Sequence, residues 1–226
     1  MFSDWGRHTA GIVEIIALQL PGREKRFGER FYETVAEAAT GLLPAVQERL
    51  NGQLEVMLFG HSMGAVLAYE LARTLITQGW VSVAQLFVSG SPAPWVQRAQ
   101  RATGLSDKEF LALVSDFAGY RHTALEEDEM RDLLLPVLRA DVAMHEGYEP
   151  SSTTPIAAPI TSIRGLSDQL VSRNEAFEWR FATSESFDLM EIPGGHMYLV
   201  ENPALLIGAI ARLAAARQGL QALPGE

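Results

Sequence analysis

One short stretch of the sequence, GHSMG at residues 60–64, restricts the fold more than any other. An apolar run at residues 54–59 precedes it, and a helix-like stretch at residues 65–72 follows it. This order of strand, tight turn and helix is typical of the turn that holds a nucleophilic serine at the end of a sheet. The glycines on either side leave room for the backbone to crowd together there. Ser62 is therefore the candidate nucleophile.

Length and composition exclude several other classes of protein. The chain has 226 residues, of which 47% are hydrophobic, and this suits a single α/β domain over residues 1–226. There is no Cys, which excludes disulfides, thiolate metal sites and a cysteine nucleophile. Apolar runs are too short to span a bilayer, and the amino terminus lacks a signal-peptide pattern, so we expect a cytoplasmic protein with no membrane partner. The net charge of −10 argues against a nucleic-acid partner.

Short apolar runs alternate with helical patterns along the chain. The predicted buried strands are residues 12–18, 54–59, 84–89, 160–164 and 187–192. Helices are predicted over residues 31–50 and 65–77, near residues 174–183, and from Asn202-Pro203 onward. Such alternation predicts a mainly parallel sheet with helices on both faces.

Residues 94–154 interrupt this alternation with helical patterns alone. Ser106 and Glu109 form a capping box that opens one helix, and a second helix is predicted over about residues 126–148, with a kink at Pro136. Ligands of open parallel sheets bind beyond the carboxyl ends of the strands, so we expect this helical insertion to act as a lid. The alternative is a packing subdomain with no gating role.

A serine nucleophile needs a base and an orienting acid. His196 comes after a Pro-Gly-Gly loop that follows the strand predicted to end at residue 192, so it is the candidate base. Asp168 lies just beyond the strand predicted to end at residue 164 and is the candidate acid. The alternative for Asp168 is a turn aspartate that caps the next helix. The order Ser62, Asp168, His196 is the order expected of an α/β-hydrolase.

The remaining histidines and aspartates are less well placed for catalysis. His61 lies at the variable position of the serine turn, where a buried or hydrogen-bonding role is expected. Solvated positions on or near polar helices are expected for His8, His122 and His145. Structural or surface roles are expected for Asp188, which lies in a strand, and for Asp116 and Asp141, which lie in the insertion.

Several stretches together resemble one known family, the type II thioesterases, which are stand-alone editing hydrolases of polyketide and non-ribosomal peptide assembly lines. The related medium-chain thioesterase of animal fatty-acid synthesis is equally similar in pattern. The matching stretches are LQLPGRE at 18–24, FGHSMG at 59–64, VSG at 88–90 with Pro92, LPVLRAD at 135–141, and PGGH at 193–196. They occur in the family's order over nearly the whole chain.

The resemblance implies both a fold and a reaction. The fold would be that of the α/β-hydrolases, with Ser62 as nucleophile, Asp168 as acid, His196 as base and the Met63 backbone N–H as an oxyanion donor. The substrate would be an acyl or aminoacyl thioester on the phosphopantetheine arm of an acyl or peptidyl carrier protein, with no metal and no cofactor of the enzyme's own. Arg98 and Arg101 are candidate contacts for an acidic carrier, the alternative being a solvated helix face.

The family pattern normally begins further upstream than residues 2–5, which match the region just after a Gly-Gly loop. We therefore expect that the preceding strand and this oxyanion loop, about 10–20 residues, are absent here. In the family this strand lies between those predicted at 12–18 and 54–59, so a gap or a rearranged pairing is expected beside the nucleophile strand. Three hypotheses follow: an editing thioesterase; another acyl hydrolase, such as a chain-releasing thioesterase or small-ester hydrolase; or a catalytically weak carrier-binding remnant lacking a complete oxyanion hole.

Overall fold

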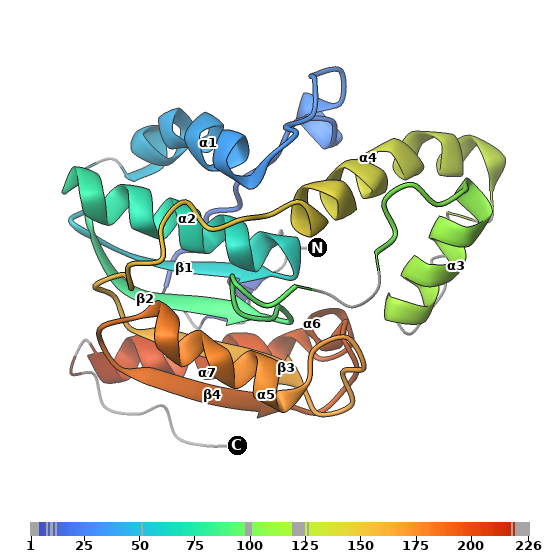
Figure 1. Cartoon of the computed structure of the whole chain (residues 1–226). Coiled ribbons are helices and arrows are strands. Elements are labelled where there is room, and N and C mark those ends of the chain that lie inside the picture. Colours follow the sequence, from blue (N-terminus) through green and yellow to red (C-terminus); the bar gives the residue numbers. More distant parts are fainter. Residues whose placement is uncertain are drawn as a thin grey trace.

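The sheet of the protein has four parallel strands in the order β1-β2-β3-β4. The computed structural model describes residues 5–7, 9, 11, 13–50, 52–97, 101–118, 125, 127–217 and 219. The strands are β1 (Glu55–His61), β2 (Ser82–Ser89), β3 (Ile160–Gly165) and β4 (Phe187–Ile192). Four of the predicted strands are thus confirmed, to within two residues at each end, and their parallel pairing agrees with the predicted alternation (Figure 1).

The strand predicted over residues 12–18 is wrong. Residue 12 lies outside the described residues, and residues 14–20 form no strand. A strand exists by pairing its backbone with a neighbour, and within the described chain β1 pairs only with β2. The apolar character of this segment has another cause, because Ile15 packs against a cluster of buried side chains.

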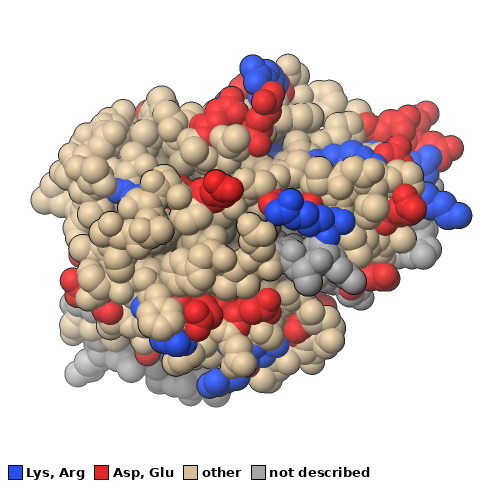
Figure 2. Space-filling model, in the orientation of Figure 1, with Lys and Arg blue, Asp and Glu red and all other residues tan. Residues whose placement is uncertain are grey.

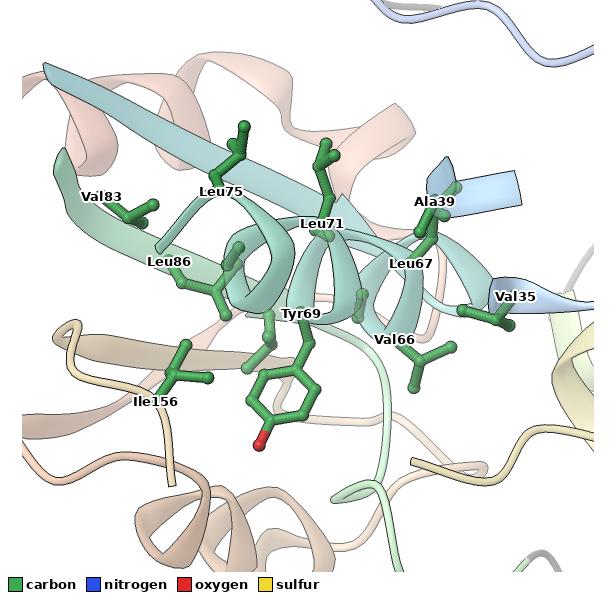
Figure 3. Close-up of a cluster of buried hydrophobic side chains, with 14 of the residues drawn as sticks. Val35, Ala39, Val66, Leu67, Tyr69, Leu71, Leu75, Val83, Leu86 and Ile156 are labelled. Atoms are coloured by element: carbon green, nitrogen blue, oxygen red, sulfur yellow. The ribbon is translucent and has the colours of Figure 1, made fainter. Parts of the chain in front are cut away.

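Helices cover both faces of the sheet, as expected. The helices α1 (Val35–Leu50) and α2 (Met63–Gln78) lie on one face, and α6 (Tyr198–Glu201) and α7 (Pro203–Arg217) lie on the other. Side chains of a strand alternate between the two faces, so Leu86 of β2 joins the cluster beneath α2 while Phe87 joins the cluster beneath α7. Figure 3 shows Leu71 and Leu75 of α2 in the first cluster, together with Leu86.

Local signals in the sequence explain where several helices begin and end. Gly79 ends α2 in the left-handed conformation (φ 66°), and its N–H donates to the Ile76 carbonyl at 3.1 Å. The last helix begins at Pro203, as predicted. The helix predicted at 31–50 begins four residues later, and the one near 174–183 is two short pieces, α5 (Arg173–Phe177) and the 3-10 helix η4 (Glu178–Ala182).

Two helices, α3 (Asp107–Ala118) and α4 (Asp128–Glu146), separate β2 from β3 along the chain. Figure 1 shows them beyond the ends toward which the strand arrows point. The predicted capping box is confirmed, since Ser106 Oγ accepts from the Glu109 N–H at 3.4 Å and the Glu109 carboxylate accepts from the Ser106 N–H at 3.1 Å. The second helix continues through Pro136.

The segment that returns from α4 to β3 is tied to α2 by a buried carboxylate. Glu70 of α2 is only 4% exposed. Its carboxylate accepts hydrogen bonds from the Tyr148 hydroxyl at 2.7 Å, the Ser151 N–H at 3.0 Å and the Ser151 hydroxyl. One turn later on the same helix, the Arg73 guanidinium donates to the Ser152 carbonyl at 3.2 Å. The return segment is therefore held to α2, the helix that follows Ser62.

A second link joins α4 to the amino-terminal part of the chain. The Arg23 guanidinium forms two hydrogen bonds with the Asp141 carboxylate, at 2.8 and 3.0 Å. Such a bidentate pair adds directional specificity to the attraction between the charges. It brings together two of the motif stretches, at 18–24 and 135–141, that lie far apart in the sequence. Asp141 is thus a structural residue, as expected.

Acidic and basic side chains are interspersed on the face shown in Figure 2, without a broad basic area among its described residues. None of the described helices combines the length and apolar character that crossing a bilayer requires.

Truncation of one core side chain tests this two-faced packing. Leu86→Ala is expected to lower the free energy of unfolding by about 2–5 kcal/mol, because Leu86 is completely buried beneath α2. Leu205→Ala, at a leucine of α7 that is 53% exposed, should change it by less than about 0.5 kcal/mol. Urea unfolding measures both. Equal losses would contradict the assignment of Leu86 to the core.

Candidate active site

Ser62 occupies a strained turn between β1 and α2. Its backbone has φ 54° and ψ −120°, which is an uncommon conformation for a residue with a side chain. The Ser62 N–H donates to the carbonyl of Ser89, the last residue of β2, at 2.8 Å. The turn therefore sits at the carboxyl end of the sheet, where the sequence predicts it.

The two glycines of the GHSMG turn have different roles. A Cβ built on Gly60 would lie 1.8 Å from the Gly64 carbonyl oxygen, so only glycine fits at residue 60. A Cβ on Gly64 would meet no atom within 4 Å. The expectation that both glycines make room for the turn is thus confirmed for Gly60 and wrong for Gly64. The backbone at Gly60 approaches the Gly64 carbonyl closely, whereas the space beside the Gly64 α-carbon is empty.

Asp168 and His196 are joined directly. His196 Nδ1 lies 2.9 Å from Asp168 Oδ2, and both side chains are buried, with 7% of the His196 side chain and none of the Asp168 side chain exposed. The other oxygen of Asp168 accepts from the N–H groups of Leu170 and Val171 at 2.8 and 3.2 Å. Burial alone would raise the pKa of Asp168, but the hydrogen bond and charge of His196 and the two N–H groups outweigh it and lower that pKa.

The loops that carry Asp168 and His196 are hydrogen-bonded to each other at the ends of β3 and β4. The Leu166 N–H donates to the Ile192 carbonyl at 2.8 Å, and the Ser167 N–H donates to the Gly194 carbonyl at 2.9 Å. A Cβ on Gly165 would lie 2.2 Å from the Gly195 carbonyl oxygen, so this approach requires glycine. Asp168 and His196 are therefore positioned by the same backbone contact.

A second imidazole lies beside the first. His61 Nδ1 and Ser89 Oγ are 2.7 Å apart, and Ser89 Oγ is also hydrogen-bonded to the Tyr198 hydroxyl. Burial raises the pKa of Tyr198, which keeps its hydroxyl neutral. The His61 and His196 rings are 4.8 Å apart between centroids. The hydrogen-bonding role expected of His61 is confirmed, with Ser89 as its partner, and neither Ser89 nor Tyr198 carries a sequence signal that would identify it.

Gly90 marks the point where the serine turn and the base loop meet. It has φ 56°, and a Cβ there would lie 2.5 Å from His61 Cε1 and 3.1 Å from His196 Cε1. Ser62 is thus one residue from His61, which faces His196, although no hydrogen bond between the Ser62 hydroxyl and the His196 ring occurs in the described part of the chain. In the absence of substrate such catalytic hydrogen bonds are often long.

A pocket lies on the side of the helical insertion, with Val66 of α2 in its lining. It lies between α2, the loop after β2 and the end of α4, and its lining includes Val66, Ala93, Val96, Arg101 and His145. Val66 is four residues beyond Ser62, which is about 6 Å along the helix. His145 is half-buried at this pocket, so the expectation of a solvated position is wrong: the end of α4 packs against the loop after β2.

The remaining candidates lie elsewhere or are not described. Asp116 and Asp188 are exposed, as expected of surface groups. His8, His122 and Arg98 lie outside the described residues. Among the residues that are described, no cluster of three or more His, Cys, Asp or Glu side chains has the arrangement of a metal site.

The family model of the thioesterase domain matches residues 1–213 of this chain. The chain belongs to the thioesterase family. This thioesterase is 32% identical over 202 residues to the gramicidin S biosynthesis protein GrsT of Aneurinibacillus migulanus, covering 89% of this chain and 78% of GrsT.

Two solved thioesterases are similar in structure as well as in sequence. RedJ, a thioesterase of the prodiginine pathway of Streptomyces coelicolor, is 33% identical with a TM-score of 0.85, over 93% of this chain and 83% of RedJ. The type II thioesterase BorB of the borrelidin cluster is 32% identical with a TM-score of 0.80, over 98% of this chain and 86% of BorB. The parallel sheet and the flanking helices are accordingly those of the α/β-hydrolase fold, and this thioesterase is a hydrolase.

The unequal glycines of the serine turn provide one test. Gly60→Ala is expected to abolish folding or lower the free energy of unfolding by more than about 3 kcal/mol, because the methyl group would overlap the Gly64 carbonyl. Gly64→Ala is the matched control, and should be neutral or stabilising by up to about 1 kcal/mol because residue 64 lies in a helix with open space beside it. Denaturant unfolding compares them, and the reverse order would contradict the described turn.

The lowered pKa of Asp168 makes a prediction about pH. Its ionised form stabilises the folded state above the pKa of an unfolded aspartate, about 3.9, and this contribution is lost as the pH falls through the lowered folded-state value. The stability difference between the wild-type protein and Asp168→Asn should therefore be largest above about pH 5 and shrink on acidification. Urea unfolding across this range measures it. Asp188→Asn, at an exposed site, is the control, and a difference that grows on acidification would contradict the prediction.

Proposed function

We propose that this thioesterase is an editing enzyme, which removes acyl or aminoacyl groups from the phosphopantetheine arms of acyl and peptidyl carrier proteins in the cytoplasm. In this proposal residues 1–226 form a single domain, with residues 94–154 as a lid within it. Ser62 is the nucleophile, His196 the general base and Asp168 the orienting acid. The enzyme needs no cofactor of its own, because the carrier protein brings the phosphopantetheine.

One observation carries the catalytic part of the proposal: the buried hydrogen bond of 2.9 Å between His196 Nδ1 and Asp168 Oδ2. With Nδ1 donating its proton to the carboxylate, Nε2 is the nitrogen left to accept a proton. The carboxylate also stabilises the imidazolium that forms. The strained Ser62 turn meets this pair at Gly90, which supports Ser62 as the group that loses the proton.

The reaction follows the usual order of acyl transfer. Ser62 Oγ attacks the thioester carbonyl while His196 Nε2 accepts the hydroxyl proton. The C–S bond then breaks, and the thiol leaves with that proton, so Ser62 carries the acyl group. Water next attacks this ester and gives a proton to His196, which returns it to Ser62 as the acid is released. The sum is one thioester and one water converted to one acid and one thiol.

The tetrahedral intermediate needs hydrogen-bond donors for its oxyanion. Met63 is the first residue of α2, and N–H groups in the first turn of a helix have no partner within the helix. We assign the Met63 N–H as one donor, aided by the positive end of the helix dipole. A thiolate is a good leaving group, so stabilisation of the oxyanion should matter more than protonation of the sulfur.

The pocket beside Val66 supports the role of the insertion as a lid over the acyl group. Its walls come from both the sheet side and α4, and they combine apolar side chains with Arg101 and His145. An acyl group bound there would lie one helical turn from Ser62. Arg101 is also a candidate contact for an acidic carrier protein.

The named contexts of the relatives support the proposed substrate. GrsT is a gramicidin S biosynthesis protein, RedJ comes from a prodiginine pathway, and BorB is a type II thioesterase of a borrelidin cluster. By analogy with these proteins, we place this thioesterase in polyketide or non-ribosomal peptide biosynthesis, of the kind that makes antibiotics.

A second candidate is a catalytically weak protein that binds carriers. One observation favours it: within the described chain β1 pairs on one side only, and Met63 is the single oxyanion donor that we assign. Loss of one such donor costs about 10²–10³-fold in rate. A chain-releasing thioesterase or small-ester hydrolase is the remaining alternative.

Substrate turnover distinguishes these functions. Wild-type protein is incubated with acetyl- and propionyl-phosphopantetheinyl carrier protein, and an intact-mass measurement follows the acyl group on the enzyme. We expect an acyl adduct on Ser62 and faster turnover of carrier thioesters than of a simple aryl ester. Ser62→Ala should form no adduct and lose at least about 10³-fold in kcat/KM, because its nucleophile is gone.

Other outcomes are equally informative. Unchanged turnover by Ser62→Ala would remove the triad, and faster turnover of the aryl ester would favour a small-ester hydrolase. Carrier binding without turnover would favour the weak carrier-binding protein. Ser184→Ala, at an exposed serine outside the site, is the matched control and should behave as the wild-type protein does.

A further inference from the structure

Arg164 lies buried beneath the loop that carries Asp168. It is the penultimate residue of β3, and only 7% of it is exposed. Its Nε donates to the Val171 carbonyl at 3.0 Å, and its Nη2 donates to the Asp168 carbonyl at 3.2 Å. One guanidinium therefore holds the loop at two carbonyl groups, that of Asp168 and that of Val171, three residues later.

The third contact of Arg164 anchors it to the neighbouring strand. Its Nη1 donates to Glu191 Oε1 at 2.6 Å, and Glu191 is the residue of β4 directly opposite Arg164 in the parallel register. The hydrogen bond from Arg164 is the main cause that lowers the pKa of Glu191 and keeps it ionised. Glu191 balances the positive charge of Arg164. The effect of Arg164 on the loop is therefore to fix its position through hydrogen bonds.

The loop that Arg164 holds is the one that aims the catalytic acid. Between the two carbonyls that Arg164 binds, the chain turns so that the Leu170 and Val171 N–H groups point at Asp168 Oδ1. That leaves Oδ2 directed at His196. The guanidinium thus holds two carbonyl groups of this turn, and two N–H groups of the same turn orient the Asp168 carboxylate. Lysine is not an equivalent, since an ammonium cannot reproduce the planar fork.

We propose that Arg164 is a positioning residue for catalysis, which holds the Asp168 carboxylate in the orientation that pairs with His196. This inference rests on the proposed function, because it requires Asp168 to be the catalytic acid. A displacement of about 1 Å in a catalytic group can cost about 10²-fold in rate, so the loss of the two hydrogen bonds from Arg164 to the loop is expected to be visible in turnover.

The test begins with matched substitutions at two arginines that share Glu191. Arg164→Met should lower kcat about 10–100-fold and leave KM within about twofold, because Arg164 is buried behind the loop and does not face substrate. Arg164→Lys should lie between this variant and the wild-type protein. Arg173→Met is the control: its Nε lies 3.3 Å from Glu191 Oε2, its side chain is 63% exposed, and it should retain wild-type kcat.

A double-mutant cycle then separates positioning from a structural role. In an Asp168→Asn background the carboxylate is already lost, so Arg164→Met should lower the residual kcat less than about threefold further. A merely structural role for Arg164 would lower kcat by the same factor in both backgrounds. The rate at which a fluorophosphonate phosphonylates Ser62, with loss of fluoride, provides a second measurement, and it should show the same pattern. If Arg164→Met does not fold, Arg164→Lys takes its place in both backgrounds.

The outcomes separate the two proposals. If Asp168→Asn alone leaves kcat unchanged, the proposed triad fails and the inference fails with it. If Asp168→Asn is nearly inactive but Arg164→Met and Arg164→Lys turn over as the wild-type protein does, the triad stands and the role of Arg164 is refuted. Equal losses from Arg164→Met in both backgrounds also refute it.

Discussion

The candidate active site depends on a close contact between two backbone segments, one at the end of β3 and the other just after β4. Gly165 brings its backbone against the Gly195 carbonyl, where a side chain would not fit. Two backbone hydrogen bonds cross the same contact. Because Asp168 lies three residues after Gly165 and His196 directly follows Gly195, a single approach of two backbones sets the distance between Asp168 and His196. The side-chain hydrogen bond of 2.9 Å is its result.

The turn that carries Ser62 is held in a comparable way, by hydrogen bonds between the ends of the neighbouring strands β1 and β2. The Ser62 N–H is held by the Ser89 carbonyl, while the Ser89 side chain links His61 to Tyr198. The last residue of β2 thus connects the turn after β1 with the helix that follows the base. Parallel strands end at one edge, and short-range hydrogen bonds between adjacent ends complete the site. The α/β-hydrolase fold needs few residues for this task, because the sheet does most of the positioning.

Much of this arrangement can be predicted from the sequence. Four strands are recognisable because buried parallel strands appear as short apolar runs, and the GHSMG turn is recognisable because its glycines and serine stand between a strand and a helix. Asp168 and His196 can be selected because each follows such a run. Residues 14–20 have the apolar character of a strand, but they pack against the core without pairing their backbone with a neighbouring strand. No local pattern distinguishes such a segment from a strand.

Contacts between distant residues are harder to predict. The space around Gly64, the pairing of Arg23 with Asp141 and the position of Arg164 behind the acid loop depend on how remote segments meet. Arg164 does carry one signal, a charged residue within a strand predicted to be buried, because a buried charge requires a partner. Its partner Glu191 lies on another strand, and only the register of β3 with β4 brings them opposite each other.

The carboxylate of Glu70 limits which part of the helical insertion is free to move. Release of the return segment would break the hydrogen bonds that Tyr148 and Ser151 donate to the Glu70 carboxylate. The buried charge of Glu70 would then be unpaired, which is costly in free energy. The exit of the insertion is therefore anchored to α2, the helix that begins directly after Ser62. If the insertion acts as the proposed lid, an opening over the site would have to come from its entry side, after β2, because its exit is tied to α2.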